Sequence, residues 1–528
     1  MHWNISHISQ RGKSRISQLS CTLIRHIYRS YHNLNTPNSA VQTLKLPTNL
    51  LQLPFTLKQS RDLIVYNNIP SGEQITLYGW IRTTRKHKKV AFVNIQDGSN
   101  EQLQQLVFHD PEAVNNLRVG MSIKVTGSVQ LRNRSDAPYE LHVSNFTVLG
   151  DVSEDDQFPL QNKYFSQDYL RRELPTVRFR SSSNGVAMRF RSRAIAALSD
   201  FFNRHGFVQT HPPLITSSDC EGAGEVFTVK SDTSKTSFFG EKEGYLTVST
   251  QLHLEALMMG LSRVWTLSPA FRAEKSATSR HLSEFWMLEA EVAYADQLEH
   301  IMSLVEGMIR TAVSILQADG QLDSALSVKS FLEKQKIEAG EGEDPDREIT
   351  FNQIVDRWNS LTQPERWLRI TYTDAVSILQ QEYDTSSATF DRPRYGDSLG
   401  SEHEKWLAKM YARGPIFVTQ YPASLKPFYM LPTSNGETVE CFDLLVPDIG
   451  ELVGGSLREH DLERLQKAVE KAGIDPSDLQ WYIELRKWGS VPHGGFGMGF
   501  ERLLCYLLGI YNIRDVIAFP RWVNHCVC

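Results

Sequence analysis

Short segments with alternating apolar and polar residues fill the chain between residues 73 and 150. Glycine, asparagine, aspartate and proline, which favour turns, separate these segments from one another. The segments are 74–85, 90–99, 101–109, 121–131 and 139–150. About five short strands in a stretch of this length predict a small closed β-barrel.

The pattern changes after residue 150, where a polar connection (151–180), the predicted hinge, leads to a second domain at 181–528. Within 189–207, apolar residues recur at helical spacing and Gly206 is a stop signal, which predicts a helix. The next segment, "FVQTHPPLIT", contains two prolines, which exclude a central position in a sheet. We therefore expect an edge strand or an interface there.

A long hairpin is predicted from "RVWTLSPAFRAE" and "EFWMLEAEVAYA", two strand-like segments joined by a polar loop. Alternation in the second segment separates acidic Glu289 and Glu291 from apolar Leu288 and Ala290. Buried carboxylates without partners cost several kcal/mol, so we expect the acidic face to line a wet or ligand-filled cavity. For any single residue, an ion pair on a solvated sheet face is a fair alternative.

A divalent-cation site is predicted from "CFDLLVPDIGELVGGSLRE", which places Asp443 and Glu451 on successive strands joined by a turn. Strict alternation would put Glu451 and Arg458 on opposite faces. A bulge at 454–455, where two glycines stand, would return them to one face.

The segment "HGGFGMGFERLLCYLLG" alternates glycine with Phe496, Met498 and Phe500. This pattern predicts a strand with one bare face, against which a flat ligand could lie. Arg502 then falls in the first turn of the following helix, where the helix dipole and a guanidinium can both meet a phosphate.

Aromatic and basic residues gather on the predicted barrel, around "RKHKK". Aromatic rings stack on unpaired bases and a basic loop can follow phosphates, so this face suits single-stranded RNA. The alternative is that the rings are core residues and the lysine run is a solvated loop. The candidate face carries Trp80, Arg82, Arg85, Phe92 and Gln104.

Composition adds limits rather than a function. The chain has 528 residues and a formal net charge of -5, so any RNA contact requires a local basic patch. The six cysteines have scattered spacing, which argues against a disulfide scaffold. By inspection, no apolar run is long enough to span a bilayer, and we expect no membrane partner.

The first 61 residues contain eight lysines and arginines and no acidic residue. Apolar residues at 16, 19, 23 and 27 lie on one helical face of this basic segment, as in an import helix. We predict a mitochondrial presequence at 1–31, cleaved after Tyr31, then an extension at 32–72, and location in the matrix. A basic RNA-binding tail is the alternative.

Three segments together resemble motifs 1, 2 and 3 of class II aminoacyl-tRNA synthetases: "FVQTHPPLIT", "FRAE" with "RHLSEF", and "GFGMGFER". The resemblance covers roughly residues 73–521 and is narrower for the aspartyl and asparaginyl branch. It implies an α+β fold, with a five-stranded OB-fold anticodon-binding barrel followed by an antiparallel catalytic sheet flanked by helices. It leaves 321–369, with its acidic "EAGEGEDPDRE", as a partly disordered surface insertion.

The resemblance also implies roles for individual residues. The residues implied to be catalytic are Arg272, Glu274 and Arg502. Those implied to bind ATP are Arg272, Glu274, His281, Leu282, Phe285, Glu451 and Arg502, with Mg2+ on Asp443 and Glu451. The amino acid would be bound by Glu221, Gln251, Arg272, Glu289 and Arg458. The anticodon would be bound by Arg85, Phe92 and Gln104, and Pro213 would lie in a homodimer interface.

Two positions bear on the choice between aspartate and asparagine. Aspartyl enzymes carry a lysine where this chain has Leu254, and an aspartate where it has Glu289. Glu289 can accept from the carboxamide NH2 of asparagine while Arg458 donates to the carboxamide oxygen. The carboxylate of an aspartate would instead place two anions, its own and that of Glu289, against each other. The expected function is ATP-dependent attachment of L-asparagine to tRNA(Asn). The alternatives are an aspartyl enzyme of relaxed tRNA specificity, a non-catalytic RNA-binding paralogue, or an asparagine synthetase on the same fold.

Overall fold

The computed structural model describes eleven stretches of the chain. They are 53–66, 70–132, 138–153, 157–161, 165–217, 226–231, 238–239, 243–276, 278–339, 349–385 and 390–528. The predicted presequence (1–31), the extension up to residue 52 and the candidate residue Glu221 lie outside these stretches. Residues from Thr56 onward form one compact unit.

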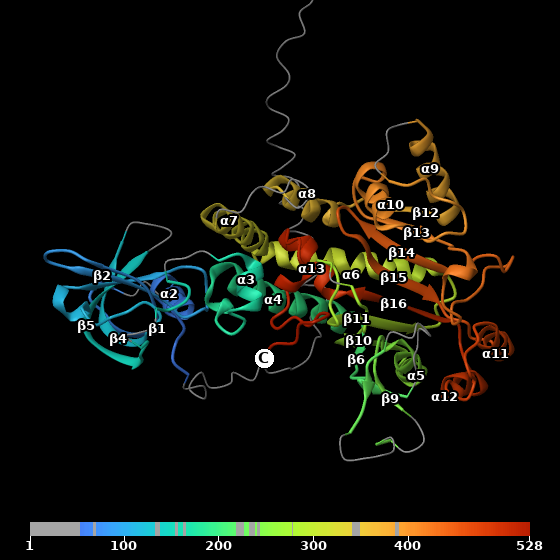
Figure 1. Ribbon diagram of the computed structural model, residues 1–528, viewed down its shortest axis with the longest axis horizontal. Helices are drawn as coiled ribbons and strands as arrows, with labels where there is room; N and C mark the ends of the chain where they lie inside the picture. The colour runs from blue at the N-terminus through green and yellow to red at the C-terminus, as the bar shows by residue number, and fades with distance from the viewer. Residues whose placement is uncertain are drawn as a thin grey trace, which may run out of the picture. The chain divides into compact units, whose positions relative to one another are not determined.

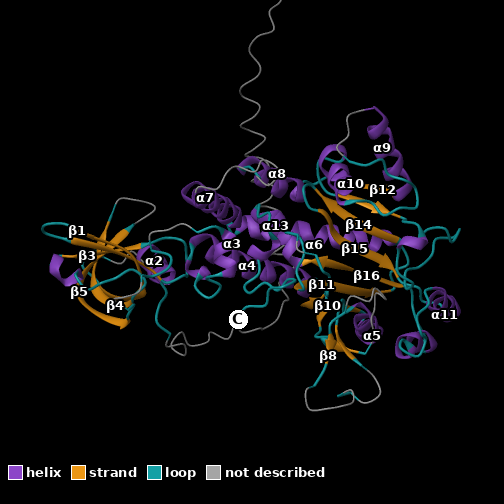
Figure 2. Cartoon of the chain, in the orientation of Figure 1, coloured by secondary structure: helices purple, strands orange, loops and turns teal. Residues whose placement is uncertain are grey.

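A helix, α2 (Leu57–Tyr66), precedes the barrel that the alternating segments predict. Its strands are β1 (Gln74–Lys86), β2 (Ala91–Gln96), β3 (Gln104–Phe108), β4 (Ser122–Leu131) and β5 (Tyr139–Gly150). They close in the order β1-β2-β3-β5-β4, and Figure 2 shows them as a barrel of strands. Every second residue points inward, so Leu77, Ile95 and Val125 are fully buried. The predicted five-stranded barrel is confirmed.

The second half of the predicted hinge is held by buried arginines. It contains α3 (Gln167–Arg172) and a 3-10 turn at Arg178–Arg180. Arg171 Nη1 lies 2.6 Å from Asp515 Oδ1, and Arg178 donates to the carbonyl oxygens of Ile517 and Ala518. These buried contacts attach the segment to the C-terminal part of the chain, so this half is no free linker.

The predicted helix is α4 (Ser182–Arg204), which begins before the predicted start and ends near Gly206. Gly206 has a φ of +73°, the left-handed conformation that ends many helices. The predicted stop signal is therefore confirmed.

A sheet of eight strands forms the centre of the second part, in the order β12-β13-β14-β15-β16-β11-β10-β6. In Figure 1 these strands follow one another from β12 to β6. The end pairs β12–β13 and β10–β6 are parallel and the other pairs are antiparallel. As the prolines predict, the segment after α4 supplies an edge strand, β6. The bounds are β6 (Val208–Gln209), β10 (Arg263–Phe271), β11 (Glu284–Ala293), β12 (Leu368–Thr371), β13 (Ile416–Thr419), β14 (Cys441–Val446), β15 (Gly450–Leu457) and β16 (His493–Gly499).

The remaining elements surround this sheet. A small sheet joins β7 (Ile215–Thr216), β9 (Gly244–Leu246) and β8 (Thr228–Val229). The helices are α5 (Gln251–Leu261), α6 (Leu298–Ala318), α7 (Gln321–Ala339), α8 (Phe351–Thr362), α9 (Tyr372–Thr385), α10 (Ser401–Trp406), α11 (Leu462–Lys471), α12 (Gln480–Glu484) and α13 (Phe500–Leu508). The largest buried apolar cluster lies between the sheet and the helices α4, α6, α7, α8 and α13.

The prediction of a surface insertion at 321–369 was wrong. Helices α7 and α8 belong to the main core: Val328, Ile354 and Trp358 are fully buried there. Trp358 Nε1 donates to the carbonyl oxygen of Leu507, 2.8 Å away. The acidic residues 340–348, which suggested disorder, lie outside the described stretches. Their composition had hidden the apolar positions of the helices on either side.

The prediction that no apolar run is long enough to span a bilayer was also wrong, because one helix has the required length. Helix α6 has 21 residues and is apolar enough to cross a membrane by composition. Its apolar side belongs to the core, where Val305, Met308 and Ile309 are fully buried. Arg310 and Glu306 form an ion pair on the same helix at 2.7 Å. A core helix passes the same length test as a membrane span.

Candidate active site

The predicted hairpin is present as β10 and β11, paired antiparallel from Arg263↔Val292 to Phe271↔Glu284. The two faces of β11 also follow the prediction. Leu288 and Ala290 are buried in the main core, while Glu289 and Glu291 lie on the opposite face. The alternation in the sequence was therefore sufficient to assign these faces.

The acidic face is buried and paired with protein groups. Glu289 is 3% exposed and accepts from the Ser249 hydroxyl at 2.5 Å and from the Thr250 N–H at 3.0 Å. Glu291 is 1% exposed and lies 2.5 Å from Arg458 Nη2. The structure thus gives these carboxylates the partners that burial requires, but the partners are protein groups, from the segment before α5 and directly after β15, and the expected wet or ligand-filled cavity is not confirmed.

Burial raises the pKa of both carboxyl groups. Hydrogen bonds from Ser249 and Thr250 and the charge of Arg458 oppose that rise at Glu289. At Glu291, burial raises the pKa to about 7, although Arg458 acts in the opposite direction. Arg458 therefore acts electrostatically on both acids and is the cation of this face.

A bulge brings Glu451 and Arg458 to the same face, as predicted, but at another residue. In the β14–β15 pairing Leu444 faces Val453 and Leu445 faces Glu451, so Leu452 is the extra residue. Of the two glycines expected to form the bulge, Gly455 serves close packing instead, because a Cβ there would lie 2.4 Å from the Phe442 ring.

The glycine-rich strand β16 lies beside the acidic strand. Phe496 and Met498 are buried in the core, so Gly495 and Gly497 face the acidic side. A Cβ at Gly495 would lie 2.2 Å from a Glu291 oxygen, whereas one at Gly497 would have ordinary contact with Met287 at 3.5 Å. Part of the predicted bare face is thus filled by Glu291, and the part at Gly497 keeps the predicted shape.

The motif 2 residues form a partly exposed group at the end of the hairpin. Arg272 follows β10, and its guanidinium carbon lies 5.7 Å from the centre of the Phe285 ring. Glu274 lies 3.8 Å from Arg272 Nη1 and 3.3 Å from His281 Nε2. The Leu282 side chain is buried in the core, so only its backbone can face a ligand. The structure thus brings four of the predicted ATP residues together.

Asp443 and Glu451, the predicted cation ligands, converge over Gly454. A Cβ at Gly454 would lie 3.2 Å from Glu451 Oε1 and 3.6 Å from Asp443 Oδ1. Both Asp443 oxygens also accept from Lys426 Nζ, at 2.7 and 3.0 Å. Burial, together with the charges of Glu451 and Asp443, raises the pKa of nearby Glu404 to about 7.

These acids fit a hard cation that is shared with phosphate. Mg2+ prefers oxygen ligands and is often held by one or two carboxylates together with substrate phosphates. Within the described stretches, no group of three or more acidic, histidine or cysteine side chains has the geometry of a complete metal site. A cation here would require further ligands from substrate or water.

Arg502 lies in the first turn of α13, as predicted, and is 41% exposed at its side chain. Its Nη1 donates to the Glu451 carbonyl oxygen at 2.8 Å and lies 3.7 Å from a Glu451 carboxylate oxygen. The guanidinium is therefore adjacent to the two acids and remains open to a ligand.

The predicted amino-acid end lies at the start of α5. Gln251 is its first residue, and Gln251 Nε2 donates to Glu255 Oε1 at 3.0 Å. Leu254 is fully buried and packs with Met258 and Val264, so position 254 supplies no cation. Glu221 lies outside the described stretches.

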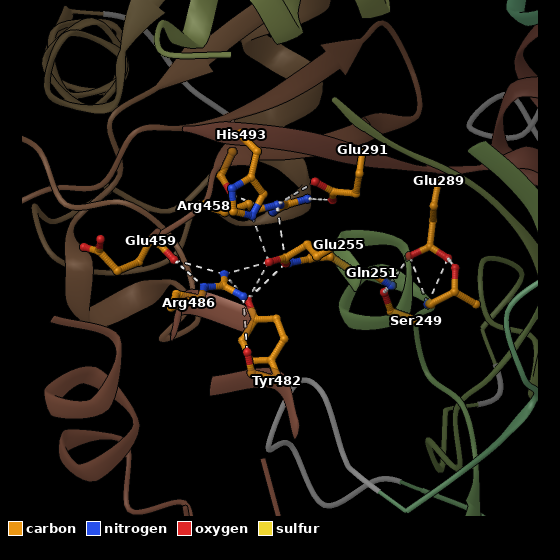
Figure 3. Close-up of polar contacts among 12 residues, drawn as sticks. Ser249, Gln251, Glu255, Glu289, Glu291, Arg458, Glu459, Tyr482, Arg486 and His493 are labelled. Carbon is orange, nitrogen blue, oxygen red and sulfur yellow. Dashed lines mark hydrogen bonds and ion pairs between the residues drawn. The ribbon is translucent and has the colours of Figure 1, made fainter. Parts of the chain in front are cut away.

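Sequence reasoning missed a buried polar group behind Gln251 and Arg458, shown in Figure 3. Its members are Glu255, Tyr482, Arg486 and His493. The one available signal was Glu255, a charged residue one turn after Gln251 on a helix with no other acidic residue and no lysine or arginine. Nothing in the sequence connects it with residues more than 220 positions away.

On the barrel, the three predicted anticodon residues do not share one face. Arg85 and Phe92 are direct neighbours across β1 and β2, on the outer face. Gln104 faces Ile95, which is a core residue, and its Nε2 donates to backbone oxygens of Gln105 and Tyr139. The register therefore separates Gln104 from the other two.

Two further residues of the predicted barrel face contact the hinge. The guanidinium carbon of Arg180 lies over the Trp80 ring, 4.9 Å from the ring centre. Arg82 donates to the Arg180 carbonyl oxygen at 2.9 Å. A bulge in β1 between Ile81 and Thr83 turns the strand at this point. The side chains of Trp80 and Arg82 therefore contact Arg180 of the same chain.

Pro213 is exposed, in the segment between β6 and β7. Apolar residues near it in the chain are accessible: Val208, on β6 of the large sheet, is 43% exposed, Leu214 is 37% and Ile215, on β7 of the small sheet, is 44%. Exposed apolar residues on edge strands are typical of a surface that pairs with another chain.

Family comparisons agree with this geometry. The family model described as tRNA synthetases class II (D, K and N) matches residues 167–523. A second model, described as an OB-fold nucleic acid binding domain, matches residues 75–149. The two matches coincide with the sheet and with the barrel.

Individual relatives cover almost the whole chain. The chain is 42% identical to the mitochondrial asparagine--tRNA ligase of Saccharomyces cerevisiae, over 85% of this chain and 92% of the relative. It is 40% identical to the mitochondrial asparagine--tRNA ligase of Schizosaccharomyces pombe, over 90% and 99%. The solved Pyrococcus horikoshii asparaginyl-tRNA synthetase complexed with asparaginyl-adenylate has a TM-score of 0.73 and 30% identity, covering 90% of this chain and 100% of that one.

Proposed function

Because the chain belongs to the class II tRNA synthetases of the aspartate, lysine and asparagine group, we propose that it joins L-asparagine to tRNA(Asn). In the first step ATP activates the amino acid to asparaginyl-adenylate. In the second step the 3'-terminal adenosine of the tRNA takes the aminoacyl group. The relatives named as asparagine--tRNA ligases support the choice of amino acid.

The observation that carries this proposal is the arrangement around Arg458. The guanidinium is buried, it is bonded to Glu291 and acts by its charge on Glu289, and position 254 has no cation. Arg458 can donate to the carboxamide oxygen of asparagine, and Glu289 can accept from its NH2 group. An aspartate side chain would bring a second carboxylate against Glu289, and such mismatches are strongly rejected.

Activation requires no protein nucleophile. The asparagine carboxylate attacks the α-phosphorus of ATP, a P–O bond forms, and pyrophosphate leaves. Positioning and charge neutralisation provide the catalysis in such a transfer. In the second step the ribose hydroxyl attacks the carbonyl carbon of the adenylate, and AMP leaves.

We assign the ATP contacts to the group at the end of the hairpin. The Arg272 guanidinium would bind the α-phosphate and the amino-acid carboxylate, since its planar fork favours the charge that develops during attack. Phe285 would stack on the adenine while Glu274 accepts from the adenine amino group. Arg502 would cover the other face of the ring and reach the γ-phosphate, with His281 nearby.

Mg2+ would be held by Asp443 and Glu451, whose carboxylates converge over Gly454. When bound, it would neutralise charge on the phosphates. Lys426 already neutralises Asp443, so this chain supplies part of the positive charge itself.

Replacing Lys426 by methionine is expected to tighten divalent-cation binding at least about tenfold, because one nearby positive charge is removed. Methionine retains an apolar stem against the Tyr421 ring, which Lys426 Nζ approaches to 4.0 Å. The affinity of the ATP-free protein for Mn2+ is measured at pH 8 by electron paramagnetic resonance. Lys426→Arg keeps the charge and serves as the control. Equal Mn2+ affinity in Lys426→Met and Lys426→Arg would show that the charge at position 426 has no effect on the cation site.

The barrel would bind the anticodon of tRNA(Asn) through Arg85 and Phe92, which are neighbours on its outer face. Replacing Phe92 by alanine is expected to raise KM for tRNA by about tenfold or more, since base stacking contributes about 1–3 kcal/mol per base. Exchange of ATP with pyrophosphate, which requires no tRNA, should stay unchanged. Gln105→Ala, on the same outer face, is the control, and equal effects of the two variants would contradict a specific stack.

We also propose a homodimer located in the mitochondrial matrix. The exposed apolar edge around Pro213 supports the dimer. The basic, acid-free first 61 residues support import, as do two yeast relatives named as mitochondrial. Sedimentation of the chain starting at His32 tests the dimer.

The proposed function is tested by ATP–pyrophosphate exchange with the chain starting at His32 and each of the twenty amino acids. Exchange with asparagine alone is the expected result. Exchange with aspartate would favour the aspartyl enzyme of relaxed specificity. Exchange with no amino acid would favour a non-catalytic RNA-binding protein.

A further inference from the structure

The carboxylate of Glu255, next to the proposed amino-acid contacts Gln251 and Arg458, has no role in the function proposed above. Glu255 is 0% exposed, yet it lies on helix α5 just one turn after Gln251. Figure 3 shows side chains from several elements directed at it. Its hydrogen-bond donors are Gln251 Nε2 at 3.0 Å, Tyr482 OH at 2.8 Å, Arg486 Nη2 at 2.7 Å and His493 Nε2 at 3.0 Å.

The bond to Gln251 sets the direction of the Gln251 amide. Residues four apart on a helix lie on the same face, so the two side chains meet without strain. Because the NH2 group donates to Glu255, the amide oxygen is directed away from Glu255. An amide oxygen is an acceptor, which the α-ammonium group of an amino acid requires.

Glu255 also acts on Arg458, the other proposed amino-acid contact. Arg458 Nε lies 4.0 Å from Glu255 Oε1, and its Nη2 and Nη1 are bonded to Glu291 and Ser456. Burial alone would raise the pKa of Glu255, but Arg486, His493 and Arg458 together hold it below its usual range. Glu255 is therefore a fixed negative charge beside the guanidinium.

Several donors keep this carboxylate in one position. Arg486 also donates to the Glu459 carbonyl oxygen through Nε and Nη2, both at 3.0 Å, and His493 Nδ1 is 2.7 Å from the Val491 carbonyl oxygen. Both of these donors are thus anchored at a second point. A carboxylate held in this way can position its neighbours rather than adapt to them.

We propose that Glu255 is a positioning residue for the amino acid, which orients the Gln251 amide and holds Arg458 in place. One carboxylate would thereby set the contacts at both ends of the substrate. The inference rests on the proposed function, because it takes Gln251 and Arg458 as the residues that bind asparagine. Glu255 itself touches neither asparagine nor ATP in this scheme.

The test is Glu255→Gln in the full chain, with KM and kcat measured by ATP–pyrophosphate exchange. Glutamine has the same shape but removes the charge and one acceptor. We expect KM for asparagine to rise at least about tenfold, with KM for ATP changed less than about twofold. Adding Gln251→Ala should then raise KM less than it does in the wild type, because both changes remove one interaction.

A matched control separates positioning from stability. Asp515→Asn breaks another buried ion pair, with Arg171 at 2.6 Å, away from the proposed site. It should lower the melting temperature without changing KM for asparagine. If Glu255→Gln lowers only the melting temperature, or raises both KM values equally, the inference is wrong.

Two further arms keep the test decisive. If Glu255→Gln does not fold, Tyr482→Phe removes a single donor and should raise KM for asparagine by about threefold; an unchanged KM would overturn the inference. If the wild type exchanges with aspartate instead, the proposed function fails. The KM split between amino acid and ATP would still decide the role of Glu255.

Discussion

Replacing Arg272 by glutamine is expected to lower kcat/KM for asparagine-dependent exchange about 10³-fold, or about 4 kcal/mol. Arg272 lies beside Phe285 and Glu274 and is proposed to bind the α-phosphate and the substrate carboxylate. Both groups approach one another during attack, so a neutral amide loses the interaction where charge develops. ATP–pyrophosphate exchange measures this step directly.

Stability should change little in the same variant. The Arg272 side chain is 34% exposed and its ion pair with Glu274 is long, at 3.8 Å, so we expect a loss below about 1 kcal/mol in the free energy of unfolding. Arg366→Gln, at a surface arginine paired with Glu299, is the control and should keep full activity. A small activity loss in Arg272→Gln would exclude Arg272 from the transition state.

Replacing Arg458 by methionine is expected to abolish asparagine activation and to destabilise the protein by about 3–5 kcal/mol. Arg458 is 3% exposed and lies 2.5 Å from Glu291 and 4.0 Å from Glu255. Its removal leaves two buried carboxylates without their shared cation. Denaturant unfolding measures the stability loss, and exchange measures the loss of activation.

The destabilisation of Arg458→Met should grow with pH. In the wild type the pKa of Glu291 is already raised to about 7 by burial, and removing Arg458 takes away an effect that lowers it. An acid whose folded pKa is raised stabilises the fold at low pH, and this stability is lost as pH rises through that pKa. The stability difference from wild type should therefore be smaller at pH 5.5 than at pH 8.

A double variant separates the two effects of Arg458. Arg458→Met with Glu291→Gln removes the buried charge together with its partner and should recover part of the stability. Asparagine activation should stay absent, because nothing then donates to the carboxamide oxygen. Recovery of activity in the double variant would show that Arg458 has only a structural role.

Local patterns in the sequence were sufficient where a structural period decided the outcome. The alternation in β11 assigned Glu289 and Glu291 to one face, and the five alternating segments predicted the closed barrel. Gly206 marked the end of α4 because a glycine adopts positive φ without strain. These features depend on residues close together in the chain.

Contacts between distant segments were where prediction failed. The bulge was expected at two glycines, but it lies at Leu452, and Gly455 instead makes room for the Phe442 ring of the neighbouring strand. Helices α7 and α8 fall within the predicted surface insertion because the acidic residues between them dominate the composition of that segment. Gln104 was expected to share one barrel face with Phe92, whereas strand register separates them.

The sequence by itself determined the order of the elements, the residue types of the candidate site and the resemblance to a family, since each is written in local spacing. Only the tertiary structure decided which partners those residues have. Glu255 lies 231 positions before Arg486, and it meets Arg486 and Arg458 because α5, the end of β15 and the turn after α12 pack together. A buried charge is stable only beside its partner, so its role follows from the packing of distant segments.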